Sequence, residues 1–142
     1  MQLVLDTNIL LSALIRNSKT RTILLHPSFS FFLPEYSLEE FEKYKGMVLE
    51  KSNLSVEELD LLLGLLLERV TVVSASTFAS FMPEAWSIMA LIDPDDSPFI
   101  ALALSFHNDG IWSQDKDFER QSKVKVWKTS DLVELIYQSK LL

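Results

Sequence analysis

The chain has 142 residues, of which 13 are Lys or Arg and 20 are Asp or Glu, so its formal net charge is −7. A chain of this length buries roughly 70% of the surface that its unfolded form exposes. We therefore expect a single domain over residues 1–142 that needs no covalent cross-links. The chain contains no Cys, which excludes disulfide frameworks, thiolate metal sites and cysteine nucleophiles and fits a reducing compartment.

The apolar runs are far shorter than the roughly 18 residues that a membrane span requires. The longest leucine-rich run, residues 61–67, is interrupted by Gly64, and the N-terminus has no basic region of the kind that opens a signal peptide. The sequence therefore predicts a cytoplasmic protein that does not enter a membrane. Its net acidity opposes binding to polyanions, because nonspecific affinity for phosphate comes from Lys and Arg. A polyanionic substrate would need another source of positive charge.

Short apolar segments alternate with helical patterns along the chain. The expected strands are residues 3–5, 28–33, 70–73, 111–113 and 124–127. The expected helices are residues 9–15, 21–25, 34–51, 55–68, 78–92 with a break at Pro83, 98–106 and 129–137, the last capped by Thr129 or Ser130. Ser55 and Glu58 have the spacing of a capping box. This alternation predicts an α/β fold, a three-layer α/β/α sandwich with a central, mainly parallel sheet.

Acidic residues stand where the expected strands end, which is the edge at which open parallel sheets bind ligands. Asp6 follows the first strand, Asp115 and Asp117 follow the fourth, and Asp95 and Asp96 precede the helix that opens at residue 98. Each also has a structural alternative, as a helix cap or as part of a solvated turn.

The helix expected over residues 34–51 adds one more acid. At 100° per residue, Glu39 lies opposite the apolar face, whereas Glu40 lies at its edge beside Tyr44 and Met47. Glu40 is therefore the candidate that borders the core. Its structural alternative is a capping box with Ser37.

Several carboxylates at one sheet edge repel one another unless a cation neutralises them. A site with oxygen ligands and no thiolate suits Mg²⁺ or Mn²⁺, which bind a few carboxylates together with substrate phosphate oxygens. Such a metal would also supply the positive charge that an acidic protein needs in order to bind a polyanion.

Four stretches, taken in order, resemble the motifs of PIN-domain proteins. They are Leu3-Val4-Leu5-Asp6-Thr7-Asn8, the helix carrying Glu40, residues 95–103, and residues 112–118. The resemblance covers nearly the whole chain. It implies a Mg²⁺- or Mn²⁺-dependent endoribonuclease that cleaves single-stranded RNA and leaves 5′-phosphate and 3′-hydroxyl ends. Many small prokaryotic members are VapC-type toxins that an antitoxin protein holds inactive, and PIN-domain proteins commonly form homodimers.

The family's acidic residues match this sequence position by position. The implied catalytic and metal-binding acids are Asp6, Glu40, Asp96 and Asp115, with Asp117 as a further, more variable metal ligand. Three acids stand close together at 93, 95 and 96, so the choice between Asp95 and Asp96 stays open. The chain carries Ser113 where Thr is common in the family, a change that keeps the hydroxyl group.

Substrate contacts are expected from polar and basic residues around these acids: Asn8, Ser113, Lys116 and Arg120. Five of the 13 basic residues stand between 116 and 128. This basic stretch is either a solvated face or a track for a phosphate backbone.

The main alternative function is a catalytically silent PIN-like module that binds RNA or a protein, since a fold can outlast its active site. A phosphohydrolase acting on small esters is disfavoured, because no Asp-x-Asp motif follows the first strand. A metal-free ribonuclease that uses His26 and His107 is disfavoured because both stand at helix boundaries.

Leucines surround the helix expected over residues 55–68 almost completely: Leu59, Leu61, Leu62, Leu63, Leu65, Leu66 and Leu67. A helix that covers a sheet needs only an apolar stripe. We therefore expect a second chain to cover part of this surface, as a homodimer partner or an antitoxin. Neighbouring helices of the same chain are the alternative cover.

Overall fold

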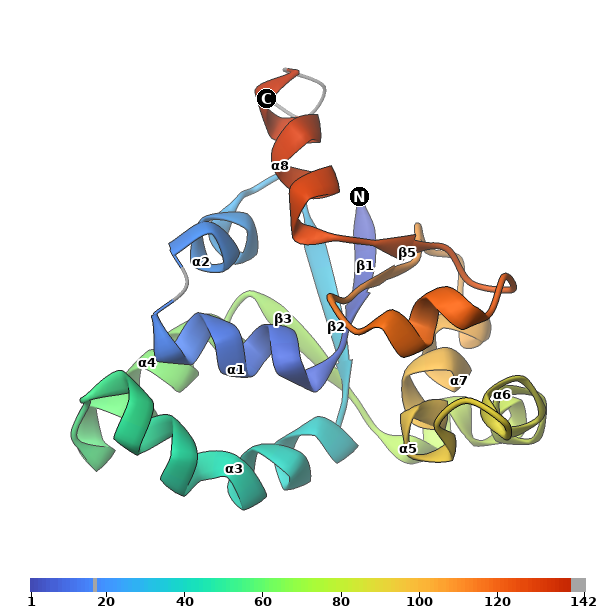
Figure 1. Ribbon diagram of the computed structural model, residues 1–142, viewed down its shortest axis with the longest axis horizontal. Helices are drawn as coiled ribbons and strands as arrows, with labels where there is room; N and C mark the ends of the chain where they lie inside the picture. Colours follow the sequence, from blue (N-terminus) through green and yellow to red (C-terminus); the bar gives the residue numbers. More distant parts are fainter. Residues whose placement is uncertain (17, 139–142) are drawn as a thin grey trace.

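The computed structural model describes residues 1–16 and 18–138; residues 17 and 139–142 of the expected single domain lie outside that description. Five strands form one parallel sheet in the order β3-β2-β1-β4-β5 (Figure 1). They are β1 (Gln2–Leu5), β2 (Ser30–Pro34), β3 (Val70–Val73), β4 (Ile111–Trp112) and β5 (Val126–Trp127). Helices cover both faces of the sheet, which confirms the predicted α/β/α sandwich.

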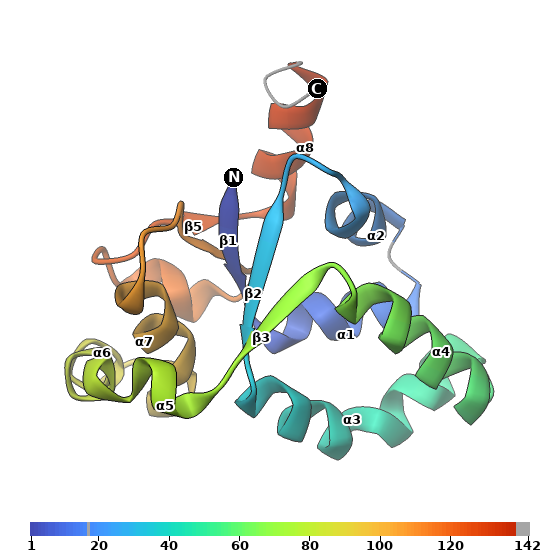
Figure 2. The same cartoon turned by 180° about the vertical axis from the view of Figure 1, so that it is seen from behind.

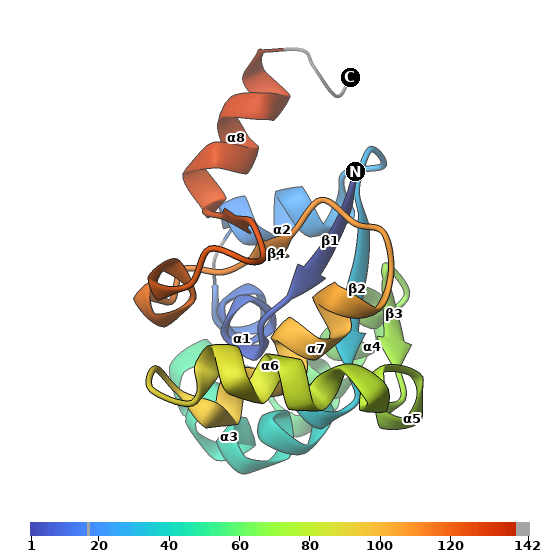
Figure 3. The same ribbon diagram turned by 90° about the vertical axis from the view of Figure 1, so that its right-hand side faces the viewer.

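Two groups of helices flank the sheet (Figures 1 and 2). One face is covered by α1 (Thr7–Ile15), α2 (Ser18–Leu25), α3 (Tyr36–Ser52) and α4 (Val56–Leu67). The other is covered by α5 (Ala75–Phe78), η1 (Ala79–Phe81), α6 (Met82–Met89), η2 (Pro94–Asp96) and α7 (Ser97–Ser105). The short η3 (Lys116–Arg120) joins β4 to β5, and α8 (Thr129–Tyr137) extends beyond the sheet (Figure 3).

The central strand β1 divides the interior into two hydrophobic cores. Leu3 and Leu5 pack into the core formed with α1 to α4, whereas Val4 packs into the core formed with α5 to α7. All three side chains have 0% exposure. Because successive residues of a strand point to opposite faces, a strand with helices on both sides must be apolar throughout.

The winding of the chain reverses beside β1. The connections from β1 to β2 and from β2 to β3 run over one face, and the connection from β3 to β4 returns over the other (Figures 1 and 2). The connections therefore diverge between β1 and β4 at the carboxyl edge of the sheet, which is where open α/β sheets form a ligand-binding crevice. Asp6 follows β1 at this point, and Ser113 follows β4.

Two helix starts differ from the prediction because of proline. Pro34 ends β2, and α3 begins only at Tyr36. The predicted break of the helix over residues 78–92 falls at η1, slightly before Pro83, and Pro83 itself lies in the first turn of α6. A first-turn position costs no hydrogen bond, because the N–H groups there have no partner within the helix.

The predicted caps have a mixed outcome. The capping box at the start of α4 is confirmed, with Glu58 N–H donating to Ser55 Oγ (3.1 Å) and Ser55 N–H donating to Glu58 Oε1 (3.0 Å). The expected cap of α8 by Thr129 or Ser130 is wrong, because Lys128 holds the N-cap position. The Thr129 hydroxyl instead accepts a hydrogen bond from the indole of Trp112 (3.0 Å).

None of the described helices is long and apolar enough to cross a bilayer.

Candidate metal centre

Carboxylates from separate segments of the chain line one cleft of about 280 Å³ at the reversal point. The acidic residues of this cleft are Asp6, Glu40, Asp93, Asp95, Asp96 and Asp115. The four acids that the sequence marked as catalytic are thus together in one cavity. A larger cavity of about 650 Å³ between α1, α2 and α8 is mainly apolar and contains Glu134 as its single acid among the described residues. Charge, and not size, therefore distinguishes the cleft.

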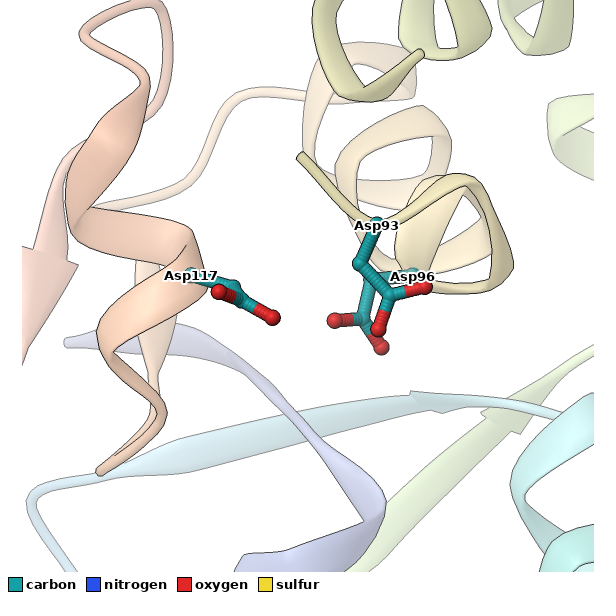
Figure 4. Close-up of side chains that lie close together, drawn as sticks. All are labelled: Asp93, Asp96 and Asp117. Atoms are coloured by element: carbon teal, nitrogen blue, oxygen red, sulfur yellow. The ribbon is translucent and has the colours of Figure 1, made fainter. Parts of the chain in front are cut away.

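Three aspartates form the tightest group of carboxylates. Asp93, Asp96 and Asp117 each place an oxygen within 4.8 Å of the others. In Figure 4, Asp93 and Asp96 project from the turn before α7 toward Asp117 on η3. Oxygen atoms converging from two segments are the donor set that Mg²⁺, Mn²⁺ or Ca²⁺ prefers.

Asp93 was not among the predicted ligands. Its position follows from the spacing Asp93-Pro94-Asp95-Asp96, because residues three apart in a 3₁₀ turn lie on the same side. The carboxylate of Asp93 also accepts a hydrogen bond from the backbone N–H of Asp95 (3.1 Å). The signal was therefore present in the sequence, in a turn whose period differs from that of an α-helix.

Asp96 is the acid whose surroundings best fit a bound cation. Its Oδ2 atom is buried and has no hydrogen-bond partner among the described residues, and an unpaired buried oxygen of this kind is costly. Burial, followed by the negative charges of Asp93, Asp115, Asp6 and Glu40, raises the pKa of Asp96 to about 7. Asp95 is exposed to solvent. The geometry therefore favours Asp96 over Asp95 and fits a metal at this position.

Asp6 is both a helix cap and part of the cleft. Its Oδ1 accepts a hydrogen bond from the backbone N–H of Ile9 (2.9 Å), so the structural alternative for this residue is confirmed. Its Oδ2 accepts a hydrogen bond from the Ser113 hydroxyl. Burial raises the pKa of Asp6 to about 6, although both hydrogen bonds act in the opposite direction. Each carboxylate oxygen keeps a second lone pair, so capping does not prevent metal binding.

Ser113 connects two parts of the site through its hydroxyl group. Its side chain is fully buried; its hydroxyl donates to Asp6 and accepts from the backbone N–H of Asp115 (2.9 Å). The structure gives no support to the expected substrate contact of Ser113, because the side chain is buried and the hydroxyl bonds to protein atoms. Asn8, by contrast, is exposed and lines the cleft.

Glu40 lies in the cleft as the helical-face argument predicted, and Glu39 is exposed. The Thr7 hydroxyl donates a hydrogen bond to Glu40 Oε1 (2.5 Å). The alternative capping box is excluded, because the N-cap of α3 is Glu35 and Ser37 already lies inside the helix. Glu40 is therefore held by the first turn of α1, next to Asp6.

The stretch after β4 is an ordered turn. Asp115 Oδ1 accepts a hydrogen bond from the backbone N–H of Asp117 (2.9 Å) and so caps η3. Lys116 and Arg120 are exposed and do not line the cleft. Arg120 contacts the carbonyl oxygen of Leu91 at 3.5 Å.

One basic residue that the sequence analysis did not select, Lys43, does line the cleft. Neither histidine lies there, so the structure gives no support to an acid–base pair of histidines.

A parallel α/β/α sheet with carboxylates gathered at its reversal point is an arrangement suited to binding a divalent cation. The sequence model of the PIN domain matches residues 4–136 of this chain, and the chain belongs to that family. PIN domains are generally nucleases. A search of curated proteins finds no match to this chain.

Proposed function

We propose that this protein is a Mg²⁺- or Mn²⁺-dependent endoribonuclease that cleaves single-stranded RNA. The observation that carries the proposal is the buried, unpaired Oδ2 atom of Asp96 in a cleft with five further acids. Within the fold of a nuclease family, a divalent cation is the simplest partner for that oxygen. Cleavage would leave 5′-phosphate and 3′-hydroxyl ends, as the family resemblance implies.

The proposed catalytic acids are Asp6, Glu40, Asp96 and Asp115, and Asp93 and Asp117 would complete the set of metal ligands. A bound Mg²⁺ or Mn²⁺ would supply Lewis acidity and an activated water for attack on a phosphodiester. The protein's own contribution is orientation. The Ser113 hydroxyl and the Ile9 amide hold Asp6, and the Thr7 hydroxyl holds Glu40.

We infer the substrate contacts of residues other than the acids from the exposure of their side chains to solvent. Asn8 lies at the cleft and is open to solvent, so we propose that it contacts the RNA near the cleaved bond. Lys116 and Arg120 lie outside the cleft and would contact phosphates farther along the strand. These contacts would offset the repulsion between RNA and a chain with net charge −7.

A cleavage assay tests the proposal. We expect the protein to cut a generic single-stranded RNA in Mg²⁺ or Mn²⁺, to stop in EDTA and to recover when the metal is restored. The alternative, a silent RNA- or protein-binding module, predicts binding without cleavage at any metal concentration. Activity that persists in EDTA would contradict both hypotheses.

We further propose that the protein acts in the cytoplasm as the toxin of a toxin–antitoxin pair, with an antitoxin protein as its inhibitor. The support is the resemblance to small toxin ribonucleases. Its expression in a bacterial host should arrest growth, and Asp96→Asn should abolish the arrest at an equal protein level. Growth arrest that is unchanged in this variant would separate any toxicity from RNA cleavage.

We also propose a homodimer in which α4 faces its partner. Leu59 and Leu66 are buried within the chain, whereas Leu61 and Leu65 are 66% and 50% exposed. Residues four apart lie on one helix face, so the two exposed leucines form one apolar surface. Helices of the same chain thus cover only part of α4.

A further inference from the structure

One positively charged side chain lies among the acids of the cleft. Of the described residues that line the cleft, Lys43 alone is basic. Lys43 lies on α3 three residues after Glu40 and directly before Tyr44, which also lines the cleft. Residues three and four apart share a helix face. Glu40, Lys43 and Tyr44 therefore form one stripe that leads along α3 from the acids toward solvent.

Lys43 has no structural partner that accounts for it. It is exposed, and the two ion pairs of the described residues join Lys45 to Asp60 (3.2 Å) and Lys128 to Glu119 (3.0 Å). Lys45, only two residues farther along α3, thus contacts α4, whereas Lys43 faces the cleft. An unpaired ammonium group beside several carboxylates can bind a phosphate that those carboxylates alone would repel.

Tyr44 offers an uncovered aromatic surface beside this cation. Its side chain is 46% exposed, and no described ring contacts it. The other tyrosine of the cleft, Tyr36, packs edge-on against Phe99 with 6.4 Å between the ring centroids. Tyr36 is therefore held by the core, and Tyr44 remains free to stack on a flat ligand group.

We propose that Lys43 and Tyr44 form a nucleotide-binding subsite, in which the ammonium group binds an RNA phosphate and the phenol ring stacks on the adjoining base. This inference rests on the proposed nuclease function and specifies its substrate. Bases in a duplex are stacked and paired, whereas a single strand can turn a base out onto an aromatic ring. The subsite therefore selects single-stranded over double-stranded RNA.

The competing explanation is that Lys43 only offsets repulsion among the acids. The two explanations differ in RNA binding. A lysine that contacts a phosphate releases counterions, and its loss lowers the salt dependence of binding by about 0.7 in the log–log slope for a single strand. A lysine that only balances the acids changes thermal stability and leaves this slope unchanged.

Fluorescence anisotropy with a short, labelled oligouridylate tests the subsite in EDTA, where no cleavage interferes, at salt concentrations raised stepwise from a low value. Lys43→Gln should weaken binding and lower the salt slope, whereas Lys45→Gln should change neither. Tyr44→Ala should weaken binding roughly fivefold or more, and Tyr44→Phe should retain it. An abasic strand of equal length should bind Tyr44→Ala and the unsubstituted protein equally. Thermal unfolding checks that each variant is folded.

Four results would overturn the subsite. They are no binding of the oligouridylate by the unsubstituted protein, and an unchanged salt slope in Lys43→Gln. The others are a loss of affinity in Tyr44→Ala that is equal for the oligouridylate and the abasic strand, and a duplex bound as tightly as the single strand. The subsite and the nuclease proposal fail separately. Binding through both residues without cleavage in Mn²⁺ would keep the subsite and refute the nuclease. Cleavage in Mn²⁺ with unaltered RNA binding by both variants would keep the nuclease proposal and refute the subsite.

Discussion

The Ser113 hydroxyl donates a hydrogen bond to Asp6 Oδ2 and thereby joins two residues that are 107 positions apart in the chain. The same hydroxyl accepts from the backbone N–H of Asp115, so one buried group fixes two acids of the cleft relative to each other. Groups that orient a metal ligand in this way commonly contribute 10- to 100-fold to metal affinity or activity.

Replacing this hydroxyl should impair cleavage without changing the fold. In Ser113→Ala, Asp6 loses a hydrogen bond that lowers its pKa, so activity should fall about 10- to 100-fold and the acidic limb of the pH–rate profile should move to higher pH. Ser113→Thr keeps the hydroxyl and is the matched control. Equal activity and equal pH profiles for all three proteins would show that the hydrogen bond does not position Asp6.

Asp6→Asn should abolish metal-dependent cleavage and leave the metal-free protein as stable or more stable. The change replaces an anionic carboxylate ligand by a neutral amide, which costs roughly a hundredfold or more in rate, but it also removes one of several repelling charges. Cleavage assays and thermal unfolding in EDTA check the two parts. Full activity would remove Asp6 from the catalytic set. Because Asn caps a helix about as well as Asp, a lower unfolding temperature would mean that repulsion among the acids does not limit the stability of the metal-free protein.

The metal-free protein should lose stability as the pH rises. Burial raises the pKa of Asp6 to about 6 and of Asp96 to about 7, both from an ordinary value of 3.8. The folded state therefore holds these two protons more tightly than the unfolded state. The resulting stabilisation is complete below about pH 4 and is lost as the pH rises through 6 and 7.

Denaturant unfolding in EDTA at several pH values measures this loss. Asp96→Asn should flatten the decline of the unfolding free energy, whereas Glu50→Gln, a change on the exposed side of α3, should leave it unchanged. The prediction fails if Asp96→Asn declines as steeply as the unsubstituted protein.

Neighbouring acids on α3 should behave differently. Glu40 lines the cleft and accepts a hydrogen bond from Thr7, whereas Glu39 is exposed. We expect Glu40→Gln to reduce the cleavage rate roughly tenfold or more and Glu39→Gln to stay within twofold. Steady-state cleavage of one RNA by both variants is sufficient. Similar rates for the two would place the site elsewhere.

Two leucines on α4 should control the oligomeric state. Replacing Leu61 and Leu65 by Asp places charges on the proposed interface, so light scattering should show a dimer for the unsubstituted protein and a monomer of about 16.3 kDa for the double variant. Leu91→Asp is the control, since Leu91 is 92% exposed and lies beyond α6 on the opposite side of the sheet. A monomer at high micromolar concentration without any substitution would refute the dimer.

The sequence predicted the layers of the fold because apolar periodicity is a local signal. The limits of β3 agree with the prediction at both ends, and the capping box at Ser55 was readable from four residues. Pro34 misled the prediction, since a proline suits both the end of a strand and the first turn of a helix. Only pairing with β3 places it in the sheet.

Most acids of the cleft were predictable from their places in the chain: Asp6 and Asp115 follow strands, and Glu40 lies on a definable helix face. Asp95 and Asp96 were predicted from their place before α7, whereas Asp93 was missed. The orientation of Ser113 was not predictable, because its burial depends on β1 and β5 on either side of β4. Lys43 was missed for a related reason. It lies outside the conspicuous basic stretch at 116–128, which contributes no basic residue to the cleft.

Anomalous scattering from crystals soaked in Mn²⁺ tests the central claim most directly. The account predicts a peak in the cleft about 2.0–2.6 Å from the Asp96 Oδ2 atom, with further contacts from neighbouring acids, and its absence in Asp96→Asn crystals soaked in the same way. A cleft without a peak at saturating Mn²⁺, in a protein that nevertheless cleaves RNA, would contradict it.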